Sequence, residues 1–455
     1  MKLYLKNVQA VKDKVLKQQL LKNRFNYSKD IEIETSKKGP LTLKKNNHYL
    51  YSRYDPIKDV SKFIDSQIDP LANIYCLFGF GLGYHVEQLM AKEPNKKIIV
   101  IDRDISTLQI AMQHIDLTSI LSNENVRIVI ISNSIKIQEF MRSLELDGSN
   151  IKWIIPQSWI STISNSSLKE ILEDIKIKEM SFLRMKNIMK ENFQNNIQLF
   201  DSHIGSLLGQ FEGKKAALVA AGPSLDDNID VLKQLKNKYF LLCVGAAYKT
   251  LLHHNIEPDA IVMSDPHDLV FEQVKGVSSQ IPLIFLATVN KEVVRYWSGT
   301  KIILFQEGYP PSEQFAKEHQ IPLIQTGGSV ATTGLDVLIK MGFAEIVFFG
   351  QDLAYKGNQS HSIYSTSNKT ISFNQLTFTV ETNSHERVAT SRSWLIFRKW
   401  IEQKIQQTPK VQFKNTSYNG ALIKGAPYVA GEHIANSAKN MEDINFLDLI
   451  SKFIK

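Results

Sequence analysis

The sequence predicts an α/β protein with two Rossmann-like doubly wound domains, joined by a long helical segment and followed by C-terminal helices. Three observations lead to this prediction. Short runs of apolar and β-branched residues alternate with helix-like segments in two separate regions of the chain. Between these regions lies a stretch without Pro or Gly, in which apolar residues recur every three or four positions. Several strand-like runs end in glycine turns, as in parallel sheets that bind nucleotides.

We place the domain boundaries where the sequence pattern changes. Residues 1–164 form the expected N-terminal Rossmann-like α/β domain, and residues 165–212 form the helical connector. Residues 213–428 form the second, central α/β domain, and residues 429–455 form the C-terminal helices. The strand candidates of the central domain are "AALVAAG", "YFLLCVGAA", "AIVMSD", "PLIFLATVN", "KIILFQ" and "EIVFFGQD".

Composition and charge restrict the class of protein. The 455 residues are 43% hydrophobic and 22% charged, as in ordinary soluble domains with their own cores. The charged N-terminal stretch predicts no secretion signal, and the apolar runs are too short to span a membrane. Both cysteines fall in strand-like runs, so we expect a cytoplasmic protein. The net charge of +8 comes without an Arg/aromatic cluster, and we expect no nucleic-acid partner.

The first glycine turn, "FGFGLGYH", follows a strand-like run in the N-terminal domain. Gly79, Gly81 and Gly83 precede a helix-like segment, and Asp102 ends the next strand. This layout is typical of nucleotide-binding units, in which the glycines allow close backbone approach and the acidic residue binds a ribose. The spacing is nearer to that of class I methyltransferases, but no methyltransferase motif follows. The turn is either a nucleotide site or a tight turn without a ligand, and we favour the second interpretation.

The second glycine turn, "AAGPSLDD", ends an apolar run at Gly222. Pro223 suits the first turn of a helix, where its missing N–H would have no partner. Ser224, with Asp227 three residues later, is typical of a capping box. A glycine between a strand and a helix N-terminus is also where α/β proteins bind phosphate or nucleotides. A capped helix and a ligand site are compatible here. Whether the turn belongs to a ligand site therefore depends on the residues at the ends of the other strands.

The other strand ends of the central domain carry polar clusters. The carboxyl ends of parallel strands meet at one edge of a sheet, so we expect these clusters to converge on a ligand crevice. The residues concerned are Ser264, Asp265, His267 and Asp268, then Thr326, Gly327, Gly328 and Ser329, and finally Gly350, Gln351, Asp352, Tyr355 and His361.

Together these motifs resemble the motility-associated factor (Maf) flagellin glycosyltransferases. The resemblance covers most of the chain and rests on "YLYSRYDPIKD", "GPSLDDNI", "LLHHNIEPDAIVMSDPHD", "TGGSVATTGLDVLIKMGFAEIVFFGQDLAY" and "NTSYNGALIKGA". It implies an enzyme that attaches a nonulosonic acid, of the pseudaminic or legionaminic type, to Ser or Thr of flagellin for flagellar assembly and motility. The central domain is similar to bacterial sialyltransferases that use CMP-sialic acid.

The resemblance also implies roles for individual residues. The residues expected to bind the CMP-activated donor are Gly222, Pro223, Ser224, Asp265, Thr326, Gly327, Gly328 and Ser329. The first three would hold the nucleotide, and the last two would face the cytidine ribose or the sugar carboxylate. Tyr355 and His361 fall where the sialyltransferases place two tyrosines that stabilise the phosphate.

Transfer from a CMP-linked sugar leaves negative charge on the phosphate and requires a base for the acceptor hydroxyl. The sialyltransferases use a histidine late in the domain as the base. In "TNSHERVATSRSW" Thr390 falls near that position, His385 lies a few residues earlier, and His267 is a further candidate. The expected catalytic residues are Asp352, Tyr355, His361 and His385. We expect no metal and no cofactor besides the CMP-activated donor, because a monophosphate leaving group needs little charge neutralisation.

Two other functions stay open on the sequence. Archaeal hydroxymethylpterin diphosphokinases share the "GPSLD" motif, which would make the chain a nucleotide-dependent kinase, although they lack the long N-terminal region. A flagellin-binding chaperone without catalytic activity is the second alternative. The expected partners are flagellin, as acceptor protein, and the CMP-sugar donor, with no membrane and no nucleic acid.

Overall fold

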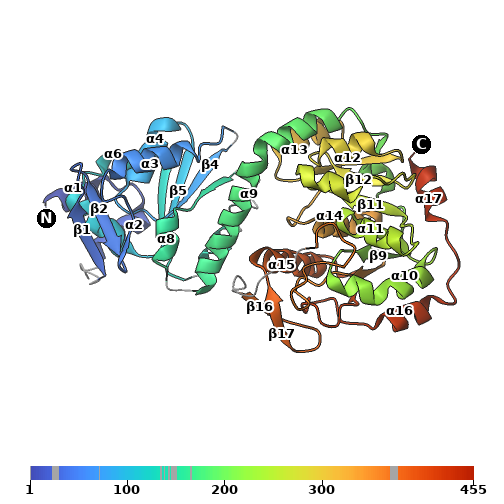
Figure 1. The fold of residues 1–455 in the computed structure, drawn as a ribbon. Helices are drawn as coiled ribbons and strands as arrows, with labels where there is room; N and C mark the ends of the chain where they lie inside the picture. The colour runs from blue at the N-terminus through green and yellow to red at the C-terminus, as the bar shows by residue number, and fades with distance from the viewer. Residues whose placement is uncertain are drawn as a thin grey trace. The chain divides into compact units, whose positions relative to one another are not determined.

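The computed structural model describes residues 2–22, 30–70, 72–133, 136–137, 139–141, 144, 151–163, 166–368 and 378–454. The chain divides into two compact units, Met1–Phe182 and Leu183–Lys455, which are labelled by element in Figure 1. The division falls inside the long helix α9 (Ser166–Asn196). The segment predicted as a connector therefore gives its first half to one unit and its second half to the other.

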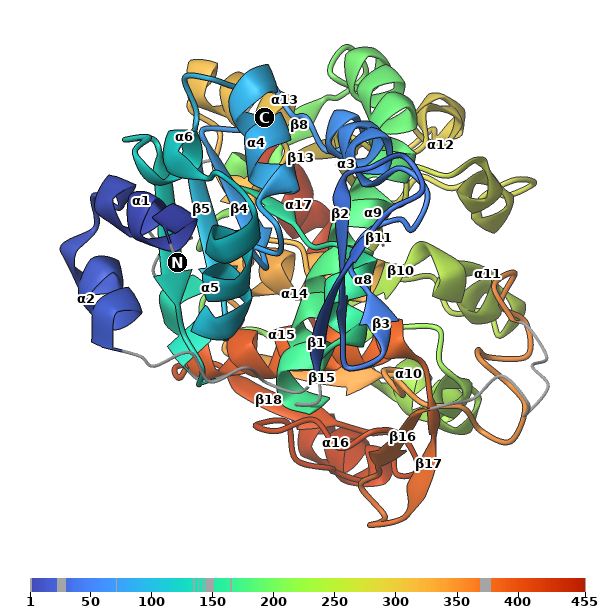
Figure 2. The same cartoon turned by 90° about the vertical axis from the view of Figure 1, so that its left-hand side faces the viewer.

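The first unit is built on a parallel sheet with the strand order β6-β5-β4-β7. The chain runs from β4 through β5 to β6 and then crosses to β7 on the other side of β4, so the sheet is doubly wound, as predicted. Helix α1 packs against α5 and α6 (Figure 2). The strands are β4 (Ile74–Phe78), β5 (Lys97–Asp102), β6 (Val126–Ile130) and β7 (Ile151–Ile154), with an antiparallel sheet of β1 (Ile31–Thr35), β2 (Leu41–Lys45) and β3 (His48–Tyr49). The helices are α1 (Lys2–Ala10), α2 (Lys14–Lys22), α3 (Pro56–Asp65), α4 (Tyr84–Lys92), α5 (Ile105–His114), α6 (Thr118–Leu121) and α8 (Gln157–Ser161).

The second unit is built on a larger parallel sheet with the strand order β14-β13-β12-β11-β10-β9-β15-β18, with β8 beside β13. Its strands are β8 (Ser202–His203), β9 (Lys215–Val219), β10 (Phe240–Val244), β11 (Ala260–Met263), β12 (Leu283–Leu286), β13 (Lys301–Gln306), β14 (Leu323–Ile324), β15 (Glu345–Phe349) and β18 (Gln412–Asn415), and β16 (Phe378–Glu381) pairs with β17 (Arg387–Thr390) as a hairpin. Its helices are η1 (Ile204–Leu207), η2 (Pro223–Asn228), α10 (Ile229–Leu235), α11 (Gly245–His253), η3 (Asp268–Gln273), α12 (Lys291–Tyr296), α13 (Pro310–Glu318), α14 (Val330–Met341), α15 (Arg392–Gln407), α16 (Gly431–Ala438) and α17 (Phe446–Phe453).

The order of the strands sets the position of the site. From β9 the chain builds β10 to β14 outward in one direction, and β15 and β18 then follow on the other side of β9. The direction of winding therefore reverses between β9 and β15, and the loops after these two strands diverge at the carboxyl edge of the sheet. The buried residues of β9, β10 and β15 explain why these runs were predicted correctly as strands.

Helix α14 makes the crossover that returns the chain to the centre of the sheet. It packs on β9, β10 and β11. Gly334 allows this close approach, because a Cβ there would lie 3.0 Å from Leu218 and 3.2 Å from Val262. The N-terminus of α14, with its predicted glycine loop, therefore stands at the carboxyl edge of the sheet.

Two asparagines at the end of α9 hold the loops of the carboxyl edge. The side chain of Asn196 donates hydrogen bonds to the carbonyl oxygens of Ala287 (3.0 Å) and Val289 (2.8 Å), which follow β12. Asn192, one turn earlier, donates to the loops after β11 and β12 at 3.1 and 3.2 Å. Both side chains are buried, so they satisfy carbonyl groups that water does not reach.

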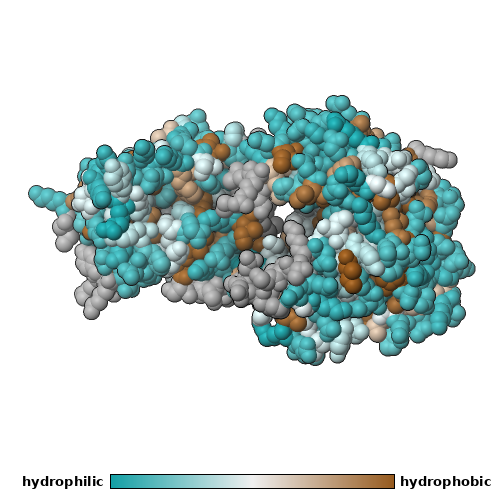
Figure 3. All heavy atoms as spheres, viewed as in Figure 1, coloured by the Kyte–Doolittle hydropathy of each residue, from teal (hydrophilic) through white to brown (hydrophobic). Residues whose placement is uncertain are grey.

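No helix in the described part of the chain combines the length and the apolar character that a membrane span requires. Most of the surface visible in Figure 3 is hydrophilic, and its hydrophobic residues form small separate groups.

We predict that Asn196→Ala destabilises the second unit by about 2 kcal/mol, because two buried carbonyl groups lose their partner. Urea denaturation followed by circular dichroism measures this loss. Gln194→Ala is the matched control, since this side chain of the same helix is exposed and its removal is expected to cost within about 0.5 kcal/mol. Equal effects of the two substitutions would contradict the assigned role of Asn196.

Candidate functional site

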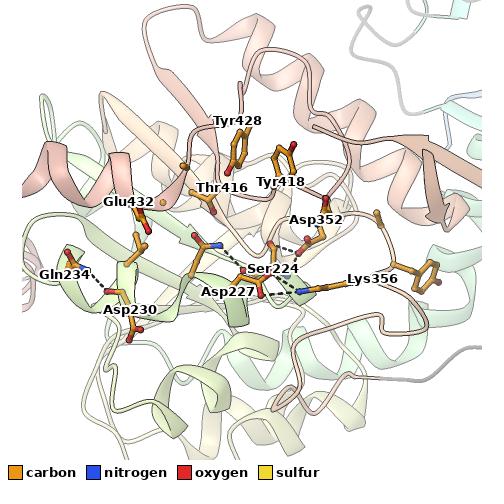
Figure 4. A pocket seen from close by; sticks show the side chains of 17 residues that line it. Ser224, Asp227, Asp230, Gln234, Asp352, Lys356, Thr416, Tyr418, Tyr428 and Glu432 are labelled. Atoms are coloured by element: carbon orange, nitrogen blue, oxygen red, sulfur yellow. Dashed lines mark hydrogen bonds and ion pairs between the residues drawn. The ribbon is translucent and has the colours of Figure 1, made fainter. Parts of the chain in front are cut away.

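A cavity of about 450 Å³ opens at the carboxyl edge of the second sheet (Figure 4). Its walls come from η2 and α10 after β9, from the loop after β15, and from the loop after β18 with the start of α16. It therefore lies where the winding of the sheet reverses, which is where doubly wound proteins bind their ligands. Of the residues predicted for the site, Ser224, Asp352 and Tyr355 line it.

The carboxylate of Asp352, just after β15, joins the loops that form the cavity. Its Oδ2 accepts hydrogen bonds from the backbone N–H (3.1 Å) and the hydroxyl (2.9 Å) of Ser224. Its Oδ1 accepts a hydrogen bond from the hydroxyl of Ser417 (2.5 Å), in the loop after β18. Burial raises the pKa of the Asp352 carboxyl above its usual value, and the hydrogen bonds from Ser417 and Ser224 oppose this rise. Asp352 thus fixes three loops from inside the protein.

The carboxylate of Asp352 leaves no space for a side chain at Gly222. Its φ of −67° suits any residue, but a Cβ would lie 2.1 Å from Oδ2 of Asp352 and 2.5 Å from the carbonyl oxygen of Gly350. Pro223 is the first residue of the 3-10 helix η2, as predicted. The predicted capping box is wrong, because the hydroxyl of Ser224 donates to Asp352 and no side chain caps η2.

Tyr355 and His361 both contact Trp394 of α15. The ring centroids of Tyr355 and Trp394 lie 4.5 Å apart, and those of His361 and Trp394 lie 6.3 Å apart. Burial raises the pKa of the Tyr355 hydroxyl, so this side chain keeps its proton and remains a hydrogen-bond donor. Nδ1 of His361 lies 2.9 Å from the hydroxyl of Ser360. The structure therefore brings both predicted phosphate-stabilising residues to one aromatic ring.

The loop of residues 326–329 caps α14. The hydroxyl of Ser329 accepts a hydrogen bond from the N–H of Thr332 (3.2 Å), and the hydroxyl of Thr332 accepts from the N–H groups of Gly327 (3.0 Å) and Ser329 (3.1 Å). Gly328 has a φ of +95°, which favours glycine. Thr326 precedes this cap, and none of the four residues lines the cavity described above. Gly327 and Ser329 were predicted to bind the CMP-sugar donor, but their backbone N–H groups already donate hydrogen bonds to Thr332.

Asp265 and His267 follow β11 and also lie outside the cavity wall. Oδ1 of Asp265 accepts a hydrogen bond from the N–H of His267 (2.9 Å), and Asp268 accepts one from the side chain of Asn290 (2.9 Å). These bonds tie the loop to the start of α12. Within the described ranges, no three His, Cys, Asp or Glu side chains are grouped in a way that would hold a metal ion.

His385 lies on the turn between β16 and β17. Its side chain is 80% exposed, and its Nδ1 is 3.4 Å from Glu381. Thr390, the alternative in this segment, is buried and donates a hydrogen bond to the carbonyl oxygen of Leu353 (2.7 Å). The structure brings neither side chain into the wall of the cavity.

Sequence analysis missed the contribution of the loop after β18. Besides Ser417, this part of the chain brings Tyr418 and Tyr428 to the cavity, with ring centroids 5.1 Å apart. Lys356, also missed, pairs with Asp227 across the cavity wall at 2.9 Å. The sequence pattern that could have revealed this loop is the short strand-like run "VQFKN" followed by the polar residues "TSYNG". The other strands of the sheet are also followed by polar residues.

In the first unit, the protein's own side chains fill the space around the glycine turn. A Cβ at Gly79 would lie 2.1 Å from the indole of Trp159, and a Cβ at Gly81 would lie 2.1 Å from the hydroxyl of Tyr51. The carboxylate of Asp102 is buried. It accepts hydrogen bonds from the backbone N–H of Phe80 in the turn (2.8 Å) and from the backbone N–H of Arg103 (2.7 Å). These contacts favour a packed turn over a nucleotide site.

We predict that Ser417→Ala destabilises the second unit by about 1.5–3 kcal/mol at neutral pH, because a buried carboxylate loses a hydrogen-bond donor. The pKa of Asp352 is already raised, so its contribution to stability is present in acid and falls as the pH rises through this pKa. Loss of the hydroxyl raises this pKa further, so the destabilisation is larger at neutral pH than in mild acid. Urea denaturation at both pH values measures it.

Ser451→Ala is the control for this substitution. The hydroxyl of Ser451 is exposed and donates to the carbonyl oxygen of Leu447 within α17 (2.8 Å). We expect a small effect that does not vary with pH. A pH-independent loss in Ser417→Ala would contradict the assigned interaction with Asp352.

We also predict that S-adenosylmethionine does not stabilise the protein, because Trp159 and Tyr51 occupy the space at the glycine turn of the first unit. A thermal-shift titration tests this, since a ligand that binds the folded state raises the melting temperature with concentration. A methyltransferase known to bind the cofactor serves as the positive control. A saturable rise in melting temperature would show that the turn opens to admit a ligand.

The sequence matches two family models. Residues 5–146 match the Maf glycosyltransferase N-terminal domain, and residues 187–358 match the family described as 6-hydroxymethylpterin diphosphokinase MptE-like. An uncharacterized protein of Treponema pallidum is 21% identical over 222 residues, which cover 46% of this chain and 75% of that protein. A second uncharacterized protein of Treponema pallidum is 23% identical over 238 residues, which cover 49% of this chain and 40% of that protein.

A solved structure supports the same grouping at the level of the fold. The Maf glycosyltransferase from Magnetospirillum magneticum matches with a TM-score of 0.52 and 16% identity, over 100% of this chain and 77% of that one. The predicted fold class and the resemblance to the Maf family are both confirmed. The chain thus matches the N-terminal domain of the Maf glycosyltransferases and, after it, an MptE-like domain, and it shares the fold of a Maf glycosyltransferase.

Proposed function

We propose that this protein transfers a nonulosonic acid, of the pseudaminic or legionaminic type, from its CMP-activated form to Ser or Thr hydroxyls of flagellin, and so serves flagellar assembly and motility. The Maf N-terminal domain and the Maf fold support a glycosyltransferase. The donor and the acceptor rest on the resemblance to the flagellin glycosyltransferases and the sialyltransferases. In this proposal the partners are flagellin and the CMP-sugar, and the reaction uses no metal ion or further cofactor.

The observation that carries the proposal is the position of the cavity. It lies at the carboxyl ends of β9 and β15, where the winding of the sheet reverses. Loops that diverge at such a point leave a crevice, and doubly wound proteins bind their ligands there. The volume of about 450 Å³ suits part of a nucleotide sugar.

The proposed reaction requires different roles of the residues at the carboxyl edge of the second sheet. When the bond between the anomeric carbon and the phosphate breaks, negative charge develops on the phosphate oxygens. The Tyr355 hydroxyl and the His361 ring are the donors proposed to stabilise this charge. Asp352 has the task of positioning, because both of its oxygens already accept hydrogen bonds from Ser224 and Ser417.

The match to the MptE-like family does not favour a pterin kinase. It covers residues 187–358, which hold much of the same sheet. Since unrelated reactions share one fold, the reaction must be argued from the site. Calorimetric titration with CMP separates the proposed enzyme from a chaperone without catalytic activity.

We predict that Tyr355→Phe and His361→Ala each reduce the modification of flagellin about a hundredfold in rate, because each removes a donor from the developing phosphate charge, worth on the order of 3 kcal/mol. The measurement is the intact mass of flagellin after co-expression with the enzyme and the nonulosonic acid pathway. The wild-type enzyme should add the mass of one nonulosonic acid at each modified site. Early time points are needed so that the enzyme limits the reaction.

Tyr364→Phe and His319→Ala are the matched controls, since both residues are exposed and lie outside the cavity wall. Full modification at an early time point in the Tyr355 and His361 double variant would exclude the two residues from catalysis. A wild-type enzyme that modifies flagellin with none of several nonulosonic acids would instead contradict the proposed function.

A further inference from the structure

One end of the cavity carries a cation and the other does not. In Figure 4, Asp227, Asp352 and Lys356 lie toward one end, and Asp230, Gln234 and Glu432 lie toward the other. Among the described residues that line the cavity, Lys356 is the one cation. A ligand with a charged and an uncharged end would therefore enter in a preferred direction.

The cation at the first end can change its partner. Lys356 pairs with Asp227 at 2.9 Å, but the two side chains are 50% and 61% exposed. Ion pairs with this exposure are weak, so a substrate anion competes readily for the ammonium group. Tyr355, the neighbour of Lys356, lines the same cavity, and burial raises the pKa of its hydroxyl, which therefore stays protonated. Asp352, at the same end, is buried with both oxygens in hydrogen bonds, so a carboxylate or a phosphate binds at this end by replacing Asp227 at Lys356.

The second end suits uncharged polar groups. The carboxylate of Glu432 repels an anion, whereas carboxylate and amide oxygens accept hydrogen bonds from hydroxyl and amide groups. Asp230 is 88% exposed and pairs with Lys233 at 3.1 Å. Glu432 is held in place by the backbone of α16, which packs directly on α10 (Figure 1). A Cβ at Gly431 would lie 2.8 Å from Val231, which shows how close the two helices are.

An aromatic pair lines the cavity between its two ends. Tyr418 is 52% exposed and Tyr428 is 37% exposed, and the planes of their rings are inclined at 55°. Figure 4 shows both rings on the same side of the cavity. Exposed aromatic faces next to hydrogen-bond acceptors are well suited to the C–H faces and hydroxyl groups of a sugar.

We propose that this cavity holds the sugar of the donor and sets its direction. The uncharged hydroxyl and amide groups of the nonulosonic acid tail lie between the tyrosine pair and Glu432. The sugar carboxylate and the phosphate lie at Lys356 and Tyr355. The inference rests on the proposed function, because it assigns a part of the same CMP-linked donor to each end of the cavity.

Isothermal titration of the full chain with two probes tests the proposal. The probes are CMP and CMP-linked N-acetylneuraminic acid, a nonulosonic acid with an uncharged polyhydroxyl tail. Tyr418→Ala and Glu432→Ala are each expected to weaken binding of the CMP-sugar about tenfold and to leave binding of CMP unchanged. Lys356→Ala is expected to weaken binding of both probes, since it removes the cation from the anionic end.

Tyr364→Ala and Glu442→Ala are matched controls, because they remove an exposed ring and an exposed carboxylate outside the cavity. Equal weakening of both probes by Tyr418→Ala and Glu432→Ala would overturn the assignment and give the cavity to the nucleotide. Unchanged binding of both probes in these variants would also overturn it. A wild-type protein that binds neither probe would instead sink the proposed function, and the inference with it.

Discussion

The site depends on one buried carboxylate. A charge inside a protein is unfavourable unless hydrogen bonds replace its hydration, and Asp352 receives those bonds from Ser224 on one side and Ser417 on the other. The loops after β9 and β18 must therefore meet at the end of β15. The same constraint acts on glycines: a Cβ at Gly420 would lie 2.9 Å from the Cα of Asp352, and Gly222 has no room for one either. The shape of the cavity follows from how these loops converge.

The regular part of the fold could be predicted from the sequence because buried central strands need continuous apolar runs. The runs at β10 and β15 are buried along their whole length, and β9 is buried at every residue after Lys215. Strand β18 is the outermost strand of the sheet beside β15 and contains a single large apolar residue, Phe413, so periodicity could not reveal it. Ser417 and Tyr418 lie in "NTSYNGALIKGA", which supported the resemblance to the Maf family, but no role was predicted for them. His385 was chosen by its place in the sequence, which could not show that it stands on a hairpin turn.

Local charge at the cavity differs from the charge of the chain. The protein has a net charge of +8, yet carboxylates outnumber Lys356 in the described wall of the cavity. Excess positive charge over the whole surface raises the concentration of anions near the protein at long range. Within the cavity, contacts of a few ångströms decide orientation, because Coulomb energy grows as the distance shrinks. In the proposed function, a donor with two negative groups is attracted by the protein as a whole and oriented by the unequal ends of one cavity.

The two units use glycine turns of the same kind for different purposes. In both, a buried parallel strand ends in glycine, and an acidic side chain accepts backbone hydrogen bonds at the turn. In the first unit, Trp159 and Tyr51 come from other segments and pack against Gly79 and Gly81. In the second unit, the side chain that packs against Gly222 is Asp352, whose short carboxylate leaves the cavity open beside it. The glycine pattern shows only that something approaches the backbone closely. The size of the side chain that approaches decides whether a ligand has room, and that side chain lies far away in the sequence.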